Sequence, residues 1–157
     1  MSRLKFLISV LVAGLLMTTL PVRAAEEVPY WVSLRTDKAN MRVGPGESYR
    51  IEWVYQREGL PLKVVRKLSG WRLVEDPDGA RGWIVSRFLT LERSAIVKGD
   101  EPVAIRAEPT GSAKLLWRAE PGVNGKLGKC SDGYCRFTVG EKSGWVAEGS
   151  LWGVGEP

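Results

Sequence analysis

The sequence predicts an all-β protein made of two copies of a small antiparallel barrel, each with about five strands. Three observations favour this fold class. Gly (18 residues) and Pro (9 residues) are frequent, short apolar stretches alternate with turn sequences, and no stretch after Ala24 keeps a helical period for three turns. Because hydrophobic residues make up 44% of the chain, we expect a turn-rich globular protein rather than a disordered one.

Residues 1–24 have the pattern of a secretory signal peptide. Arg3 and Lys5 give a positive start, residues 6–20 form an apolar run, and Ala24 supplies a small side chain for cleavage. A retained membrane helix is the alternative, but a run of 15 residues is shorter than the roughly 20 needed to span a bilayer. We therefore expect cleavage after Ala24, export to the periplasm and no stable membrane anchor afterwards.

The rest of the chain repeats itself. Equivalent residues of the two halves are 62 to 64 positions apart, and the pairs are Arg42 with Arg106, Trp53 with Trp117, and Trp83 with Trp145. We assign the first repeat to residues 25–92 and the second to residues 93–157. Each repeat is expected to fold around its own hydrophobic core.

Strand-like segments within the first repeat are rich in β-branched and aromatic residues, and they cover residues 51–55, 62–68, 71–74 and 83–85. Turn sequences containing Gly, Pro or Asp separate them, at residues 44–46, 58–59, 69–70 and 76–79. This alternation predicts antiparallel strands joined by tight turns in each repeat.

The charge distribution argues against nucleic-acid binding. The formal net charge is +5, and the predicted signal peptide carries three of the positive residues, Arg3, Lys5 and Arg23, and no acid. The mature chain is therefore close to +2, with basic residues placed singly among acids. A nucleic-acid reader is expected to have a basic stripe with interleaved aromatic rings. We interpret the charges as a mixed, solvated surface.

Cys130 and Cys135 are the only cysteines of the chain, and Asp132-Gly133 lies between them. Asp-Gly is a hairpin turn sequence, so the two thiols are expected at opposed positions of adjacent strands. A thioredoxin-like motif has two intervening residues rather than four, and a zinc site needs ligands that a chain without His lacks. We therefore predict a structural disulfide, as an exported chain allows.

Glu75, Asp76 and Asp78 form the only dense group of carboxylates. Glycosidases use two carboxylates about 5–10 Å apart, and one of them has a raised pKa. Nothing near these acids in the sequence would desolvate one, so we interpret them as solvated turn residues. Their spacing also lacks the other ligand positions of an EF-hand calcium loop. No catalytic residue, metal or cofactor is expected.

Motifs of the first repeat resemble the bacterial SH3-like (Src-homology-3-like) domain. The matching residues are Asn40-Met41-Arg42, Gly44-Pro45-Gly46, Tyr49, Gly59, Gly70-Trp71, Gly82-Trp83-Ile84 and Leu89. Residues 51–55, 133–135 and 151–154 are also similar to an exported two-repeat subgroup common in alphaproteobacteria. The resemblance implies two tandem SH3-like barrels that follow a signal peptide.

The resemblance further implies a non-enzymatic binding module that recognises peptidoglycan or an envelope peptide. The expected stacking surface is Tyr49, Trp71, Trp83 and Phe88, and the expected partners of ligand carboxylates are Arg42, Arg72 and Arg87. So small a barrel should bury most of its aromatic rings yet leave at least two exposed. Because the second repeat has Tyr134 for Trp71 and Ser150 for Phe88, we expect binding to reside mainly in the first repeat.

Two other functions compete with this one. A protein–protein adaptor or structural subunit of the cell envelope would use the same rings to dock a partner protein. A cell-wall hydrolase is the third hypothesis, and it is disfavoured because the chain has no His and its acids are poorly placed.

Overall fold

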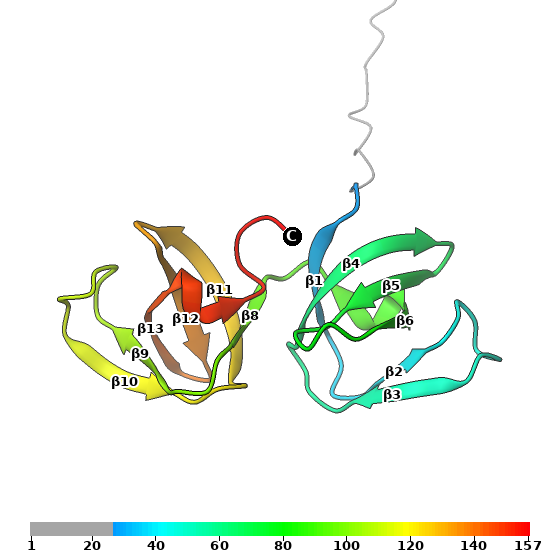
Figure 1. Ribbon diagram of the computed structural model, residues 1–157, viewed down its shortest axis with the longest axis horizontal. Coiled ribbons are helices and arrows are strands. Elements are labelled where there is room, and N and C mark those ends of the chain that lie inside the picture. Colours follow the sequence, from blue (N-terminus) through cyan, green and yellow to red (C-terminus); the bar gives the residue numbers. More distant parts are fainter. Residues whose placement is uncertain (1–26) are drawn as a thin grey trace, which may run out of the picture.

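The computed structural model of the protein describes residues 27–157. The predicted signal peptide and its cleavage site lie outside the described residues. The chain folds into two β barrels that lie side by side, with the C-terminus between them (Figure 1). The first sheet has strand order β3-β2-β6-β5-β4-β1-β7 and the second has order β10-β9-β13-β12-β11-β8-β14, all neighbours being antiparallel.

The elements of the first barrel are β1 (Tyr30–Leu34), β2 (Ala39–Arg42), β3 (Ile51–Tyr55), β4 (Pro61–Leu68), β5 (Trp71–Glu75), β6 (Arg81–Val85), the 3-10 turn η1 (Ser86–Phe88) and β7 (Leu89–Thr90). Those of the second barrel are β8 (Ser94–Val97), β9 (Val103–Arg106), β10 (Leu115–Ala119), β11 (Asn124–Ser131), β12 (Tyr134–Val139), β13 (Lys142–Ala147), η2 (Glu148–Ser150) and β14 (Leu151–Trp152). The all-β class and the tandem architecture are confirmed.

Each sheet has seven strands rather than about five. One added strand, β7, is only two residues long and follows η1, so it leaves no periodic pattern. The other, β1, lacks alternation because Val32, Ser33 and Leu34 are all buried. A strand covered on both faces loses the inside–outside pattern on which strand prediction depends.

The first hydrophobic core is not confined to the first repeat. Its buried members include Leu62, Val64, Val74 and Ile84, but Ile96 of β8 belongs to the same cluster, and Trp152 of β14 packs against it. Each barrel therefore has its own core, as expected, but residues of the second repeat complete the first core. A barrel of about 60 residues buries little apolar surface by itself, and the second repeat supplies part of what the first needs.

The buried residues of the second core come from β8, β9, β10, β12, β13 and β14, and the fully buried side chains include Phe137, Ile105 and Val146. Cys135 is fully buried in the same cluster. It forms the predicted disulfide with Cys130, which stands directly opposite it in the β11–β12 register. Asp132 and Gly133 have φ values of 53° and 77°, as the tight turn of a two-residue hairpin requires.

Candidate ligand-binding surfaces

The loop between β2 and β3 is held by an arginine and capped by an aromatic ring. Arg42 Nη1 donates a hydrogen bond of 2.7 Å to the carbonyl of Tyr49. The Tyr49 ring lies so close to Gly44 that a Cβ at that position would collide with it. Gly44 is thus required by the ring, and Tyr49 itself remains 48% exposed. The role of Arg42 in holding this loop was not expected from the sequence.

The second repeat has an arginine equivalent to Arg42 but has Ala113 at the position of Tyr49. Arg106 Nη1 donates to the carbonyl of Ala113 at 2.7 Å, which reproduces the Arg42–Tyr49 bond seven residues along the chain. Ala113 offers no flat surface to a ligand. Both barrels therefore hold this loop with an arginine, whereas Tyr49 has no aromatic counterpart at position 113.

The two predicted hairpin tryptophans share one face of the sheet. Trp83 stands opposite Leu73 of β5 and Arg42 of β2, and Trp71 stands opposite Val85 of β6. Directly opposed residues of antiparallel strands point to the same side, so this face lies away from Val74 in the core. Trp83 is only 8% exposed and Trp71 is half-buried. Trp83 can therefore offer little ring area to a ligand.

Arg87 and Phe88 of η1 lie together at the end of β6. The Arg87 guanidinium carbon is 4.9 Å from the centre of the Phe88 ring, and Arg87 Nη2 is 3.7 Å from Glu47 Oε1 in the loop described above. Phe88 packs against the first core. The structure thus brings Arg87 and Phe88 near the loop that carries Tyr49.

Arg72 does not belong to that group. Its Nε donates to the Tyr30 hydroxyl at 3.0 Å, and its Nη1 donates to the carbonyls of Ser69 and Trp71 at 3.1 and 2.9 Å. These bonds tie the β4–β5 turn to β1. Of the seven predicted ligand-binding residues, Tyr49 and Arg87 are the ones with well-exposed side chains.

A groove between the two barrels exposes a different aromatic ring. It has a cavity volume of about 720 Å³. Its aromatic and charged lining residues are Trp53, Tyr55, Arg57, Asp76, Asp78, Lys98 and Trp152. Trp53 is 59% exposed, more than any other large hydrophobic side chain of the described residues. We call this cavity the Trp53 groove. With Tyr49, it confirms that at least two rings of the first repeat stay exposed.

The floor of the Trp53 groove is a buried polar network. The Tyr55 hydroxyl donates to Asp76 Oδ2 at 2.9 Å, and Asp76 Oδ1 accepts bonds from the backbone N–H groups of Asp78 and Ala80 at 3.0 and 2.8 Å. Asp76 is only 7% exposed, so its interpretation as a solvated turn residue is wrong. Burial, together with the bond to Asp76, raises the pKa of Tyr55 well above its usual value near 10.

Glu75 is committed to ion pairs. Its Oε1 is 2.7 Å from Lys63 Nζ, and its Oε2 accepts a bond of 2.7 Å from Arg81 Nε. These three residues stand opposite one another on β4, β5 and β6. The hydrogen bond from Lys63, and then that from Arg81, lowers the pKa of the Glu75 carboxyl. A general acid needs a raised pKa, so Glu75 is unsuited to that role.

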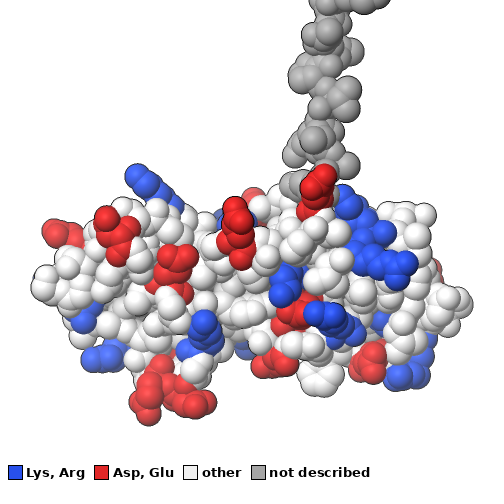
Figure 2. Space-filling view, turned by 45° about the horizontal axis from the view of Figure 1, so that its top comes forward, with Lys and Arg blue, Asp and Glu red and all other residues white. Residues whose placement is uncertain are grey.

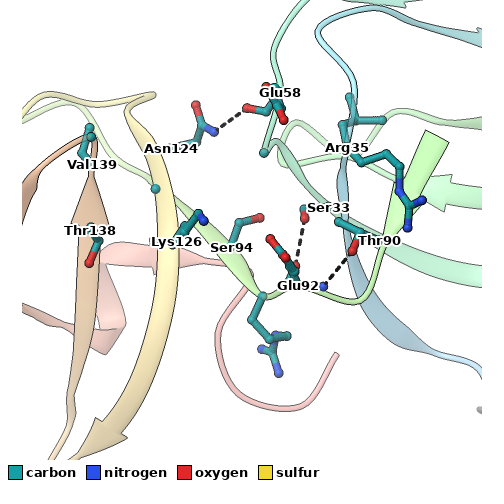
Figure 3. Close-up of a pocket in the computed structure, with 15 residues that line it drawn as sticks. Ser33, Arg35, Glu58, Thr90, Glu92, Ser94, Asn124, Lys126, Thr138 and Val139 are labelled. Carbon is teal, nitrogen blue, oxygen red and sulfur yellow. Dashed lines mark hydrogen bonds between the residues drawn. The ribbon is translucent and has the colours of Figure 1, made fainter.

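A second cavity, of about 570 Å³, lies between the barrels on other residues (Figure 3). We call it the Ser94 cleft; among its charged and polar lining residues are Arg35, Glu58, Glu92, Ser94, Asn124 and Lys126. Ser33 Oγ donates to the carbonyl of Glu92 at 2.8 Å, and Asn124 Nδ2 donates to the carbonyl of Glu58 at 3.0 Å. The second bond joins the two barrels across the cleft.

Sequence reasoning missed both cavities. Trp53 and Tyr55 are two positions apart in a strand, which places them on one face. The opposite wall of the groove comes from Ile96, Lys98 and Trp152, about 40 to 100 residues further along the chain. Nothing in the self-similarity of the repeats predicts how the two barrels dock.

The remaining surface is mixed in charge, as predicted. On the face drawn in Figure 2, both Lys or Arg and Asp or Glu side chains lie over each barrel, with a group of Lys and Arg side chains at one end. Within residues 27–157, no three His, Cys, Asp or Glu side chains are grouped as a metal site would require. The same residues contain no helix with the length and apolar character needed to cross a bilayer.

Two small antiparallel barrels in tandem, with open cavities between them, define the class of fold of this chain. The chain belongs to the bacterial SH3 domain family, whose sequence model matches it twice, over residues 35–90 and 99–153. Both barrels are thus members of one family, as the 62- to 64-residue offsets indicate.

The chain is also similar to a curated protein and to solved structures. Over 116 residues the chain is 28% identical to YrvJ of Bacillus subtilis (strain 168), a protein named as a candidate N-acetylmuramoyl-L-alanine amidase; the match covers 72% of this chain and 21% of YrvJ. NlpC1 from Trichomonas vaginalis has a TM-score of 0.37 at 14% identity, over 88% of this chain and 50% of that one. An NlpC/P60 family protein from Bacillus cereus ATCC 10987 has a TM-score of 0.34 at 14% identity, over 78% of this chain and 56% of that one. The chain therefore spans about a fifth of the curated relative and about half of these solved structures.

Proposed function

We propose that this protein is a non-enzymatic, exported module of the periplasm that binds peptidoglycan or an envelope peptide in the Trp53 groove. The observation that carries the proposal is the 59% exposure of Trp53 inside a cavity of about 720 Å³. An exposed flat ring beside a few convergent polar groups is a typical ligand surface. The likeness to a named amidase supports a cell-wall ligand, and the disulfide supports export.

The charged side chains of the groove suit a polar ligand. Lys98 and Asp78 line the groove together with Trp53, and so does Arg57, which donates to the carbonyl of Gly122. Asp76 has its oxygens occupied by Tyr55 and by backbone N–H groups, so it supports the groove rather than binding ligand. A peptide or a sugar–peptide unit combines apolar area with such charges. The outer loop with Tyr49 and Arg87 remains a second candidate surface on the first barrel.

The non-enzymatic part of the proposal follows from the chemistry of the acids. Glu75 is held ionised by Lys63 and Arg81, and Asp76 is enclosed by hydrogen bonds. The chain has no His to act as a general base. Zymography on cell-wall material should therefore give no clearing band, and a clearing band that depends on this protein would contradict this part.

An envelope adaptor is the alternative, and one observation favours it. Leu115 and Leu116 of the edge strand β10 are 42% and 45% exposed, which suits a protein partner. A pull-down separates the two functions. Retention of the mature full chain on purified, protein-free peptidoglycan supports the proposal, whereas retention only in whole-envelope extracts supports the adaptor.

A further inference from the structure

The Ser94 cleft contains a buried hydroxyl without a partner. Ser94 is 6% exposed, and its Oγ makes no hydrogen bond. Buried polar side-chain atoms are bonded in the large majority of cases, because an unpaired one costs free energy. Ser94 lines an open cavity, so a rotation of its side chain towards that cavity would present this unused donor to a ligand.

Lys126, on the strand next to Ser94, has a side chain without an ion-pair partner among the described residues. Lys126 of β11 stands directly opposite Ser94 of β8, so the two side chains share one face with Cβ atoms about 5 Å apart. Figure 3 shows both residues at the cleft, on the side opposite Ser33 and Thr90. No ion pair or side-chain hydrogen bond among residues 27–157 involves Lys126. Ser94 and Lys126 thus offer one hydroxyl and one positive charge to the same functional group of a ligand.

We propose that the Ser94 cleft binds a carboxylate, with Lys126 as its charge partner and the Ser94 hydroxyl as a hydrogen-bond donor. The other charged residues of the cleft are Arg35 and Arg93, which are positive, and Glu58 and Glu92, which are negative. The cleft therefore carries one excess positive charge. Arg93 is engaged by the carbonyls of Gly153 and Gly155, which leaves Lys126 as the cation next to Ser94.

This site goes beyond the proposed function, because the Ser94 cleft and the Trp53 groove share no lining residue. The carboxylate could be the C-terminus of a peptide or an acidic side chain. The two sources differ in their covalent surroundings: a terminal carboxylate ends the peptide backbone, whereas an acidic side chain branches from a continuous backbone. Either carboxylate would accept a hydrogen bond from the Ser94 hydroxyl and pair with the Lys126 ammonium.

Three probes test the proposal on the mature full chain, by amide chemical shifts at low salt. They are N-acetyl-alanyl-alanine with a free carboxylate, its C-terminal amide, and N-acetyl-aspartate amide. We expect the free carboxylate to perturb the amides of Ser94, Asn124 and Lys126 with saturation, and the amide probe to bind at least tenfold more weakly. Binding of N-acetyl-aspartate amide as well would assign the site to any carboxylate, and its failure would assign the site to peptide termini.

Variants decide whether these two residues carry the binding. Lys126→Met should weaken binding of the carboxylate probe about tenfold and Ser94→Ala about fivefold, as expected for hydrogen bonds to a charged group. Lys129→Met, an exposed lysine on the same strand outside the cleft, is the matched control and should change the affinity less than twofold.

Ser94→Ala also has a stability readout. Because the hydroxyl has no partner, its removal should leave the melting temperature of the free protein unchanged or slightly raised. Equal affinity of the carboxylate and amide probes, or full affinity in a folded Lys126→Met variant, would overturn the proposal. Failure of the chain to bind peptidoglycan would not, since that test reports on the Trp53 groove.

Discussion

The Trp31 ring meets the Trp152 ring edge to face, with the ring centroids 4.7 Å apart and the planes at 80°. Trp31 belongs to the first strand of the first barrel and Trp152 to the last strand of the second. Trp31 Nε1 also donates to the carbonyl of Gly155 at 3.1 Å. Arg57 Nη1 adds a bond of 2.6 Å to the carbonyl of Gly122. These contacts hold the two barrels in one arrangement, which forms both cavities between them.

Trp152→Ala should destabilise the whole mature chain, not only the second barrel. The ring packs on the first core and on Trp31, so its loss should lower the free energy of unfolding by about 2–4 kcal/mol. Urea denaturation followed by circular dichroism measures this change. Trp53→Ala, in which an exposed ring is removed, is the matched control and should cost about 1 kcal/mol or less. Equal costs for the two variants would contradict a shared core.

Replacing Cys130 and Cys135 together by Ala should lower the free energy of unfolding by about 2 kcal/mol or less. The disulfide closes a short loop, and the entropy that it removes from the unfolded chain grows with loop length. The first barrel should stay folded, because the bond lies in the β11–β12 hairpin of the second. Thiol titration of the exported protein should find no free sulfhydryl, and two free sulfhydryls would refute the structural disulfide.

Tyr55→Phe should reduce the alkaline sensitivity of the fold. The pKa of Tyr55 is raised in the folded state, so its contribution to stability is fully present below the unfolded value near 10. Above that pH the unfolded chain loses the proton first, and stability falls by up to about 1.4 kcal/mol per pH unit. At neutral pH the variant should be about 1–2 kcal/mol less stable, because Asp76 Oδ2 loses its donor.

The measurement is urea denaturation of both proteins between pH 8 and pH 11. The other tyrosines and the lysines titrate in both, so the difference between the two curves reports on Tyr55. The cost of the substitution should shrink as the pH rises above 10. A cost that stays constant across this range would mean that Tyr55 does not keep its proton in the folded state.

The sequence predicts the local elements of this fold and not their docking. Strands such as Ile51–Tyr55 and Trp71–Glu75 have residue types and flanking turns that determine them locally, as does the hairpin closed by Cys130 and Cys135. The burial of Ser33 and Asp76 depends instead on long-range contacts, with Glu92 and Tyr55 respectively. Such contacts leave no periodic pattern along the chain.

The same limit applies to the candidate site. Tyr49 and Arg87, two of the seven residues predicted to bind ligand, are exposed as that role requires. Arginine is a residue type that binds ligand carboxylates. Arg42 and Arg72 instead donate hydrogen bonds to backbone carbonyls of their own barrel, and the sequence does not reveal these partners. Trp53 lies in a groove because the second barrel forms the opposite wall, and this docking cannot be predicted from the sequence around Trp53.

Quantitative co-sedimentation of the mature full chain with protein-free peptidoglycan tests the central claim most directly, with Trp53→Ala and Tyr49→Ala as a matched pair of exposed aromatic residues. If the groove between the barrels is the binding site, loss of the Trp53 ring should weaken binding about five- to hundredfold, as expected for a stacking surface worth about 1–3 kcal/mol. Tyr49→Ala should stay within about twofold of the parent. Undiminished binding by a folded Trp53→Ala protein, with loss of binding in Tyr49→Ala, would contradict the claim and move the site to the loop of the first barrel.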